Sequence, residues 1–296
     1  MNVLCLEIYL FSTIFTKVMN NYLLTICCIL LLFSCTKSSP EFVPSQNPFE
    51  VMPLRFQQNV LIEHFSDELQ TLTVENATRV NQLKEQFNGR LFDANFHQND
   101  FLATPFTSYL SQSLGGAINI SQAAINRQAA RSGLSNDTVV WLPSPQWESL
   151  IYDALQFNDA ALSISLETGI ISNSKGFANI YIAHKTALPA NCKLLIYLLE
   201  DEINSVDQQG DTTDFKHQSV FKTTLTSWDG DLINLTNETA DGEILKFRYD
   251  NILLKEHNIL NLKVMAIVYT DSNNFKERKI INVQEVKFNG IHLWDI

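Results

Sequence analysis

The chain has 296 residues, enough for two ordinary domains after a leader, and 45% of its residues are hydrophobic while 18% are charged. This composition is typical of a globular protein and excludes a fully disordered one. The formal net charge of −11 argues against a nucleic-acid partner and against electrostatic docking on anionic lipid, because both need a basic surface.

The N-terminus carries an apolar stretch that predicts export. Residues 22–33 read YLLTICCILLLF, which is too short for a comfortable transmembrane helix and suits the core of a signal peptide. The stretch ends in the sequence LFSC, which resembles a lipobox that closes at Cys35. We therefore predict a signal peptide over residues 1–34, beginning at Met1 or Met19, and lipidation of Cys35.

The residues that follow Cys35 read TKSSPEFVPSQNP, a polar stretch with prolines that predicts a tether over residues 35–56. Together these segments predict a chain anchored by lipid in the outer membrane, on its periplasmic or its surface face. The alternative is an N-terminal membrane anchor that is never cleaved.

Residues 57–158 contain alternating strand and helix patterns. An apolar strand is predicted at 60–65 and another at 90–97. Between them lies a helix with apolar residues at spacings of three and four, namely Val74, Ala77, Val80, Leu83 and Phe87. This order predicts a parallel strand–helix–strand unit. A short helix, a strand and a helix are predicted to follow, with the sequences TPFTSYLSQSLGG, AINISQAAINR and SPQWESLIYDALQF.

From Ala160 onward the pattern changes to short runs that alternate apolar and polar residues. The runs are ALSISLETG, FANIYIAHKT, CKLLIYLLE, EILKFRY, NLKVMAIVYT and KIINVQEVKF, separated by turn-like segments. Six or seven strands at this spacing predict an antiparallel β-sandwich, of the immunoglobulin-like kind, over residues 159–296.

Four patches occur in an order that resembles one family. They are VLIEHFSDELQTLTV, FDANFHQNDF, ISQAAINR and FKHQSVFKTTLTSWDGDL. The chain resembles the outer membrane protein 28-like lipoprotein family of Bacteroidota-type bacteria over about residues 57–290. The resemblance implies an α/β thioredoxin-like domain over 57–158, followed by the β-sandwich domain.

The resemblance also implies that redox chemistry is lost. Gln70 and Thr73 fall where the family has its two redox cysteines, and Ser121 stands where thioredoxin folds place a cis-proline. A dithiol oxidoreductase needs a reactive thiolate and a second, resolving thiol, which these residues cannot supply. Apart from Cys35, the mature chain has only Cys192, which lies beside an apolar run and is predicted to be a buried, inert thiol.

Two acidic or histidine clusters could bind metal, but we favour structural roles for both. His64 and His97, with Glu63 or Asp100, could form a partial metal site, yet they lack the tight spacing of a zinc motif. The carboxylates of the loop SVDQQGDTTDF lack the spacing of an EF-hand and are read as a solvated loop; they are Asp207, Asp211 and Asp214.

His217 and Trp228 belong to the last of the four patches and could form part of a ligand or partner surface. We favour a structural role, in which Trp228 caps the sandwich core and His217 bonds across a strand pair. With His64 and His97, these two residues form the predicted interaction surface.

The sequence contains no nucleophile elbow, phosphate loop or dinucleotide fingerprint, and it predicts no enzyme, no metal and no cofactor. The leading hypothesis is a non-catalytic envelope lipoprotein that binds another envelope protein, a glycan or a host molecule. One alternative is a chaperone-like or thiol-handling factor that works through Cys192. Another is a structural subunit of an envelope assembly.

Overall fold

The computed structural model describes residues 47–116, 119–131, 137–156, 159–206, 208–209, 215–233 and 242–294. The predicted signal peptide, Cys35 and most of the tether lie outside the described residues. Residues 47–296 form one compact unit, which is mostly β, with few helices and mixed sheets.

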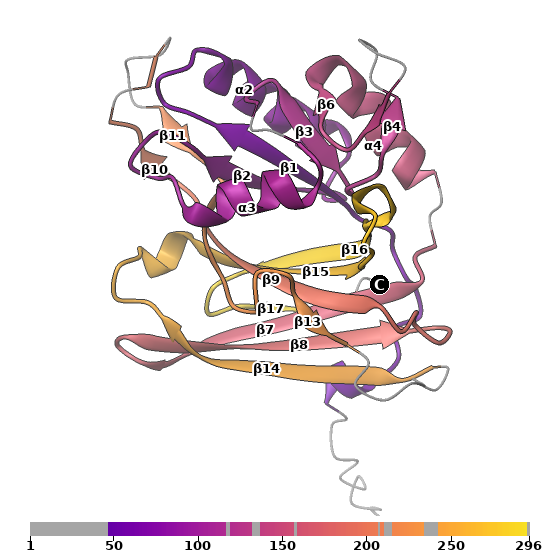
Figure 1. The fold of residues 1–296 in the computed structure, drawn as a ribbon. Coiled ribbons are helices and arrows are strands. Elements are labelled where there is room, and N and C mark those ends of the chain that lie inside the picture. Colours follow the sequence, from indigo (N-terminus) through magenta and orange to yellow (C-terminus); the bar gives the residue numbers. More distant parts are fainter. Residues whose placement is uncertain are drawn as a thin grey trace, which may run out of the picture. The chain divides into compact units, whose positions relative to one another are not determined.

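The N-terminal half confirms the predicted parallel strand–helix–strand unit (Figure 1). Strands β1 (Val60–Ser66) and β2 (Leu91–His97) pair in parallel, and helix α2 (Leu72–Gln86) connects them. Strand β3 (Gln122–Ile125) pairs antiparallel with β1, and β6 (Leu142–Pro143) with β3. The remaining elements of this half are α3 (Pro105–Ser113), β4 (Ala130–Arg131), β5 (Thr138–Val139), η2 (Ser144–Gln146) and α4 (Trp147–Leu155).

All six strands that the alternating runs predict are present in the C-terminal half. They are β7 (Leu162–Ser172), β8 (Lys175–His184), β9 (Cys192–Glu200), β14 (Ile244–Leu253), β15 (Leu262–Thr270) and β16 (Lys279–Lys287). Shorter elements complete it: β10 (Ile203–Asn204), β11 (Lys216–His217), β13 (Asp231–Leu232), η3 (Ile259–Asn261), η4 (Phe275–Glu277) and β17 (Ile291–His292). One four-stranded sheet has the order β14-β8-β7-β17.

Strand β12 (Val220–Thr224), which the sequence analysis did not name, joins the two halves. It pairs parallel with β2 at Val220 and antiparallel with β9. A single sheet therefore runs in the order β16-β15-β9-β12-β2-β1-β3-β6. Because this sheet crosses the expected boundary near residue 158, the division into a thioredoxin-like domain and an immunoglobulin-like domain stays a prediction.

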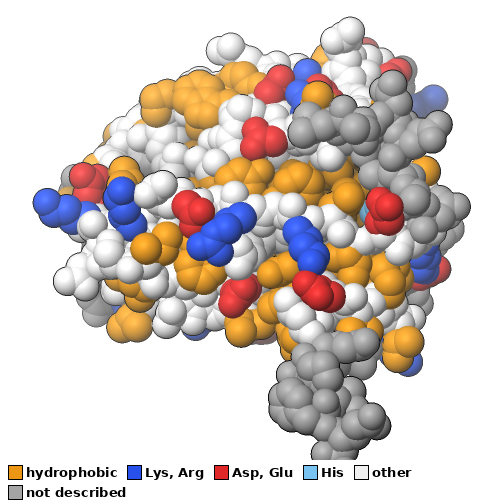
Figure 2. Space-filling view, turned by 90° about the horizontal axis from the view of Figure 1, so that it is seen from below, with side chains coloured by type: hydrophobic (Ala, Val, Ile, Leu, Met, Phe, Trp, Pro, Cys, Tyr) orange, Lys and Arg blue, Asp and Glu red, His pale blue; other side chains and the backbone are white. Residues whose placement is uncertain are grey.

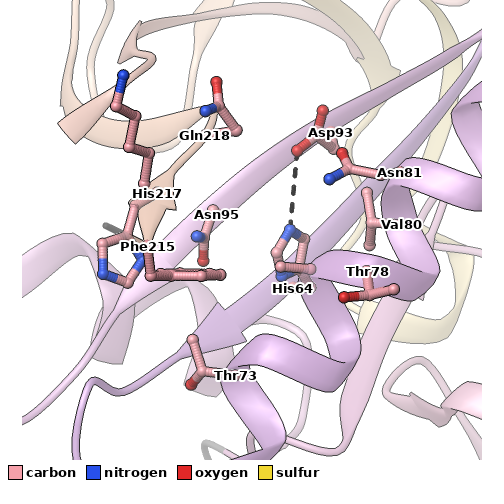
Figure 3. Close-up of a pocket in the computed structure, with 12 residues that line it drawn as sticks. His64, Thr73, Thr78, Val80, Asn81, Asp93, Asn95, Phe215, His217 and Gln218 are labelled. Atoms are coloured by element: carbon pink, nitrogen blue, oxygen red, sulfur yellow. Dashed lines mark ion pairs between the residues drawn. The ribbon is translucent and has the colours of Figure 1, made fainter. Parts of the chain in front are cut away.

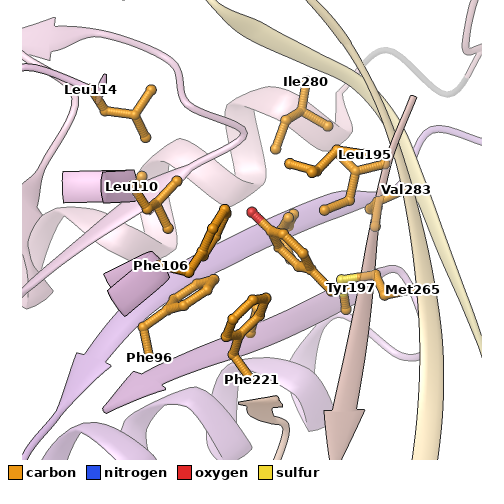
Figure 4. Packing of buried hydrophobic residues seen from close by; sticks show 14 of the residues in the cluster. Phe96, Phe106, Leu110, Leu114, Leu195, Tyr197, Phe221, Met265, Ile280 and Val283 are labelled. Carbon is orange, nitrogen blue, oxygen red and sulfur yellow. The ribbon is translucent and has the colours of Figure 1, made fainter. Parts of the chain in front are cut away.

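One hydrophobic cluster also draws on both halves. Phe96 and Phe106 both meet Tyr197 edge-on, while Phe221 is tilted against Phe96 and stacked on Phe106 (Figure 4). Side chains of β9 alternate between this cluster and a second one that faces the four-stranded sheet. Burial on both faces explains why β9 reads as an almost continuous apolar run rather than as an alternating one.

The chain enters the described unit on the outer face of the four-stranded sheet. There the short helix η1 (Pro48–Glu50) lies beside β14 and β8 (Figure 1), and the ring of Phe49 stacks on Tyr181 at 4.4 Å. The indole of Trp294 donates to the Pro48 carbonyl at 3.0 Å. Seen from below, this side mixes basic, acidic and apolar side chains, without one field of a single sign (Figure 2).

A buried ion pair fixes β1 against β9. Glu63, on β1, has no exposed surface, and Arg127, which follows β3, is 4% exposed. The Nε and Nη2 atoms of Arg127 donate to the two carboxylate oxygens of Glu63 at 2.9 and 2.8 Å. The hydroxyl of Tyr197 donates to Glu63 Oε1 at 2.8 Å and accepts from Arg127 Nη2 at 3.0 Å. Each charge is thus paired and hydrogen-bonded, as burial requires.

We predict that Arg127→Met lowers the free energy of unfolding by about 3–5 kcal/mol, because Glu63 would stay buried without its partner. Urea unfolding of the purified chain, followed by circular dichroism, measures this. Adding Glu63→Leu should recover part of the loss, since it removes the unpaired charge. Lys246→Met, which breaks the exposed pair with Glu50, is the matched control and should leave the midpoint unchanged. An equal effect of the two single substitutions would contradict the prediction.

Candidate functional site

A small cavity of about 70 Å³ lies between helix α2, the parallel strands β1 and β2, and the segment around β11 (Figure 3). Its lining includes the polar side chains of His64, Asp93, Asn95 and His217. In parallel α/β sheets, ligands usually bind near the carboxyl ends of the strands. His64 and Asn95, which pair in register, lie in the C-terminal halves of β1 and β2.

The alternation of strand side chains places these polar groups. One face of β1 carries Leu61, Glu63 and Phe65 and packs in the cluster that contains Tyr197 of β9. The opposite face carries Ile62 and His64 and points toward α2. Asp93, Asn95 and His97 share the α2 side on β2. This spacing of polar residues at every second position in LFDANFH is a signal that the sequence analysis did not use, and it would have identified Asp93 and Asn95.

Several buried polar atoms at the cavity have no hydrogen-bond partner. His64 is 3% exposed and neither of its ring nitrogens is hydrogen-bonded, although Nε2 lies 3.8 Å from Asp93 Oδ2. Asn95, 4% exposed, has an unpaired Oδ1, and His217 has an unpaired Nδ1. A buried polar group without a partner costs about 1–3 kcal/mol, so such groups in one place mark a site that a ligand or water can satisfy.

Asp93 is a buried charged group that lines this cavity. Burial acts to raise the pKa of its carboxyl, but Lys84, His64 and Lys263 together outweigh burial and hold the pKa well below its usual range. The ammonium of Lys84 binds Asp93 Oδ1, which leaves Oδ2 on the side of His64. The carboxylate is therefore ionised and faces the imidazole (Figure 3).

His217 is held in one protonation state by its neighbours. Burial, and secondly the nearby His97, lower its pKa to about 4, although Glu68 acts in the opposite direction. Its Nε2 lies 3.1 Å from Glu68 Oε1, which also accepts from the Ser205 hydroxyl at 2.6 Å. Because Glu68 is the acceptor, the single proton of His217 sits on Nε2, and Nδ1 is a lone pair.

His97 lies behind the cavity lining and does not line the cavity itself. Its ring meets the ring of His217 edge-on, with centroids 4.5 Å apart. Its Nδ1 pairs with Asp100 at 2.7 Å, and its Nε2 is 3.3 Å from the amide nitrogen of Asn95. Of the four residues of the predicted interaction surface, His64 and His217 line the cavity, and His97 packs on His217.

Trp228 does not belong to this cavity. It is 47% exposed and packs on Tyr109 and Phe106 of α3 and the strand region beside it, with ring centroids at 5.3 and 5.9 Å. It thus contacts the hydrophobic cluster that contains Phe106, and its role as a cap of the core stays a prediction.

The positions that the resemblance aligned with redox residues have other uses. Gln70 is exposed, and its carbonyl accepts from the Gln208 amide at 3.0 Å. Thr73 is buried, and its hydroxyl both donates to the Asp67 carbonyl and accepts from the Asp67 amide. Ser121 precedes β3, and no peptide bond among the described residues is cis.

Cys192 is buried and free, and burial raises the pKa of its thiol to about 11. Such a thiol is almost wholly protonated at neutral pH and is a poor nucleophile.

In the described part of the chain, no three histidine, cysteine, aspartate or glutamate side chains converge as a metal site would require. Of the two clusters that the sequence suggested, the structure describes only the histidine cluster. Glu63 is engaged by Arg127 and His97 by Asp100, so they do not join His64 in a site. Asp207, Asp211 and Asp214 lie outside the described residues. None of the described helices is both long enough and apolar enough to cross a membrane.

The fold and the cavity define a mostly β protein with a small polar site beside a parallel strand pair. The model of the family Outer membrane protein Omp28 matches residues 118–290, more than half of the chain, so the chain belongs to this family. Membership of this family makes it an outer-membrane protein of the cell envelope. The resemblance to this family is confirmed; the alignment of Gln70 and Thr73, before residue 118, stays a prediction.

Two solved structures resemble most of the chain. HBP35 of Porphyromonas gingivalis superimposes with a TM-score of 0.67 at 18% identity, over 79% of this chain and 76% of that one. A protein from Agrobacterium tumefaciens superimposes with a TM-score of 0.53 at 10% identity, over 80% of this chain and 96% of that one. At these identities the likeness concerns the fold alone. No curated protein matches the chain.

The pKa of His217 predicts a loss of stability on mild acidification. Unfolded histidine takes up a proton below its ordinary pKa of 6.5, whereas folded His217 stays neutral down to about 4. The free energy of unfolding should therefore fall as pH is lowered through this interval. The lowered pKa values of Asp93 and Asp100 act only below the ordinary aspartate value of 3.8.

Urea midpoints measured across this interval test the prediction. His217→Gln should flatten the decrease, while His257→Gln, at a histidine that does not line the cavity, should leave it as in the wild type. Parallel curves for wild type and His217→Gln would show that this imidazole does not control the effect.

Proposed function

We propose that this chain is a non-catalytic outer-membrane lipoprotein that binds its partner through the cavity between α2 and β11. The observation that carries the proposal is the set of unpaired polar atoms on His64, Asn95 and His217, each more than nine-tenths buried. A structural core would gain by pairing or replacing these groups, since each costs free energy when left unsatisfied.

The local arrangement supports a degenerate thioredoxin-like origin for this site. The strands follow the order β2-β1-β3-β6, with a parallel pair and then antiparallel neighbours. Thr73, at the position aligned with the second redox cysteine, lines the cavity and closes a turn with Asp67. The redox dithiol is replaced, and the platform that carried it presents polar groups.

The place of the anchor fits this role. We propose that lipid is attached at Cys35, so that the chain reaches the described unit at residue 47. That entry point lies on the outer face of the four-stranded sheet, whereas the cavity lies among α2, β2 and β11, away from it (Figure 1). A partner in solution or in a neighbouring protein could then reach the cavity. The partner classes are an envelope protein, a glycan or a host molecule.

The alternative of a thiol-handling factor has little support, because Cys192 is buried and its pKa is raised. A chaperone-like role without a thiol, or a role as a structural subunit, would use an extended surface rather than this cavity.

Site-specific photo-crosslinking in the native host tests the proposal. A photoreactive phenylalanine replaces Gln218, which lines the cavity, or Arg248, which is exposed on β14, as the control position. We expect an adduct at position 218 and none at 248. Ala77→Phe, which fills the cavity, should lower the yield at 218 about tenfold, whereas the smaller Ala77→Ser should leave it unchanged.

Circular dichroism of each variant shows whether it is folded. An adduct at 218 whose yield does not depend on Ala77→Phe in a folded protein would overturn the proposal. So would a turnover activity that a substitution in the cavity abolishes.

A further inference from the structure

The unpaired atoms of the cavity are mainly hydrogen-bond acceptors. The proton of His217 lies on Nε2, toward Glu68, so its buried Nδ1 can only accept. The amide nitrogen of Asn95 faces His97 Nε2 at 3.3 Å, and the proton of His97 is used toward Asp100, so the amide donates. The unpaired Oδ1 of Asn95 is therefore a second acceptor.

His64 supplies the third acceptor. Its Nε2 faces the ionised carboxylate of Asp93 at 3.8 Å, with no other partner for either ring nitrogen. A neutral imidazole beside a carboxylate carries its proton on the nitrogen that faces the charge, which leaves Nδ1 as a lone pair. Three acceptors thus come from β1, β2 and β11, and His64 and His217 lie on either side of Asn95 (Figure 3).

The charges around the cavity favour a cation. Of the nearby carboxylates, Asp93 lines the cavity, Glu68 bonds to the lining residue His217, and Asp100 bonds to His97, which packs on His217. Lys84 neutralises Asp93, but its ammonium is bound to the far oxygen, Oδ1. Lys216, which lines the rim, pairs with Glu202 at 2.8 Å. Among the described residues, the bonds to Glu68 and Asp100 come from imidazole, hydroxyl and backbone groups.

We infer that this cavity binds a primary ammonium group, whose three N–H bonds match the three acceptors on His64, Asn95 and His217. The inference rests on the proposed function, since it names the ligand chemistry of the same cavity. A volume of about 70 Å³ holds a head group and its neighbouring carbon, so the rest of the ligand lies outside. A lysine side chain, a peptide N-terminus or a free amine has this chemistry.

A carboxylate or phosphate fits less well, because it would place acceptors against acceptors. A transition metal ion also fits less well, because no three metal-binding side chains converge in the described residues.

Isothermal titration calorimetry of the purified full chain in detergent tests the inference. The probe is ethylammonium chloride at neutral pH, compared at equal ionic strength with tetramethylammonium chloride, which has the same charge and no N–H donor. We expect saturable ethylammonium binding in about the millimolar range, which is the limit for so small a ligand, and none of tetramethylammonium.

Variants at Asn95 sharpen the test. Asn95→Leu removes an acceptor and should weaken ethylammonium binding about tenfold, and Asn95→Asp, which keeps the shape and adds negative charge, should tighten it about tenfold. Asn179→Leu, on the surface of β8, is the control and should change nothing. If Asn95→Leu does not fold, the predicted tightening of ethylammonium binding in Asn95→Asp still tests the inference.

Equal binding of the two cations, or an affinity unaffected by Asn95→Asp, would overturn the inference. The two proposals fail in different ways. If ethylammonium does not bind while crosslinking at position 218 still depends on Ala77→Phe, the cavity binds a ligand of another class. If both experiments fail, the cavity is no binding site.

Discussion

The buried ion pair between Glu63 and Arg127 is the interaction on which the rest of the structure depends. Removing two charges from water is costly, and the cost is offset only when every lone pair and proton finds a partner. Tyr197 supplies a further partner to each charge, and the Arg127 guanidinium lies 5.0 Å from the centre of the Tyr269 ring. One ion pair therefore ties β1 and the end of β3 to β9 and β15.

Hydrogen bonds fix the backbone turn that carries Arg127. Asn126 and Arg127 both have positive φ, at 47° and 52°, a conformation that costs free energy for residues other than glycine. The Asn126 side chain accepts from the Leu61 amide at 2.8 Å, and its carbonyl accepts from the Ile280 amide at 3.0 Å. These bonds join the turn to both halves. With β1 fixed in this way, its opposite face presents His64 at a constant place under α2.

Much of this fold follows from the sequence, because apolar periodicity predicts strands and helices well when burial is local. The six long strands of the C-terminal half and the N-terminal strand–helix–strand unit are present. Strand β12 was missed because VFKTT is short and pairs with strands far away in the chain. Tyr197 gave no signal of a polar role, since its hydroxyl matters only once Glu63 lies beside it. His64 and His217 were identified by residue type, but their common cavity depends on contacts across about 150 residues that a single sequence does not reveal.

The central claim is that the polar cavity is a binding site in a fold without redox thiols. The most direct measurement is a high-resolution crystal structure of the protein released from its native outer membrane, with attention to density beside His64, Asn95 and His217. The account predicts continuous non-water density that extends from the cavity past Gln218 and contacts Asn95 Oδ1. A cavity filled only by ordered waters that bridge the three side chains would contradict it.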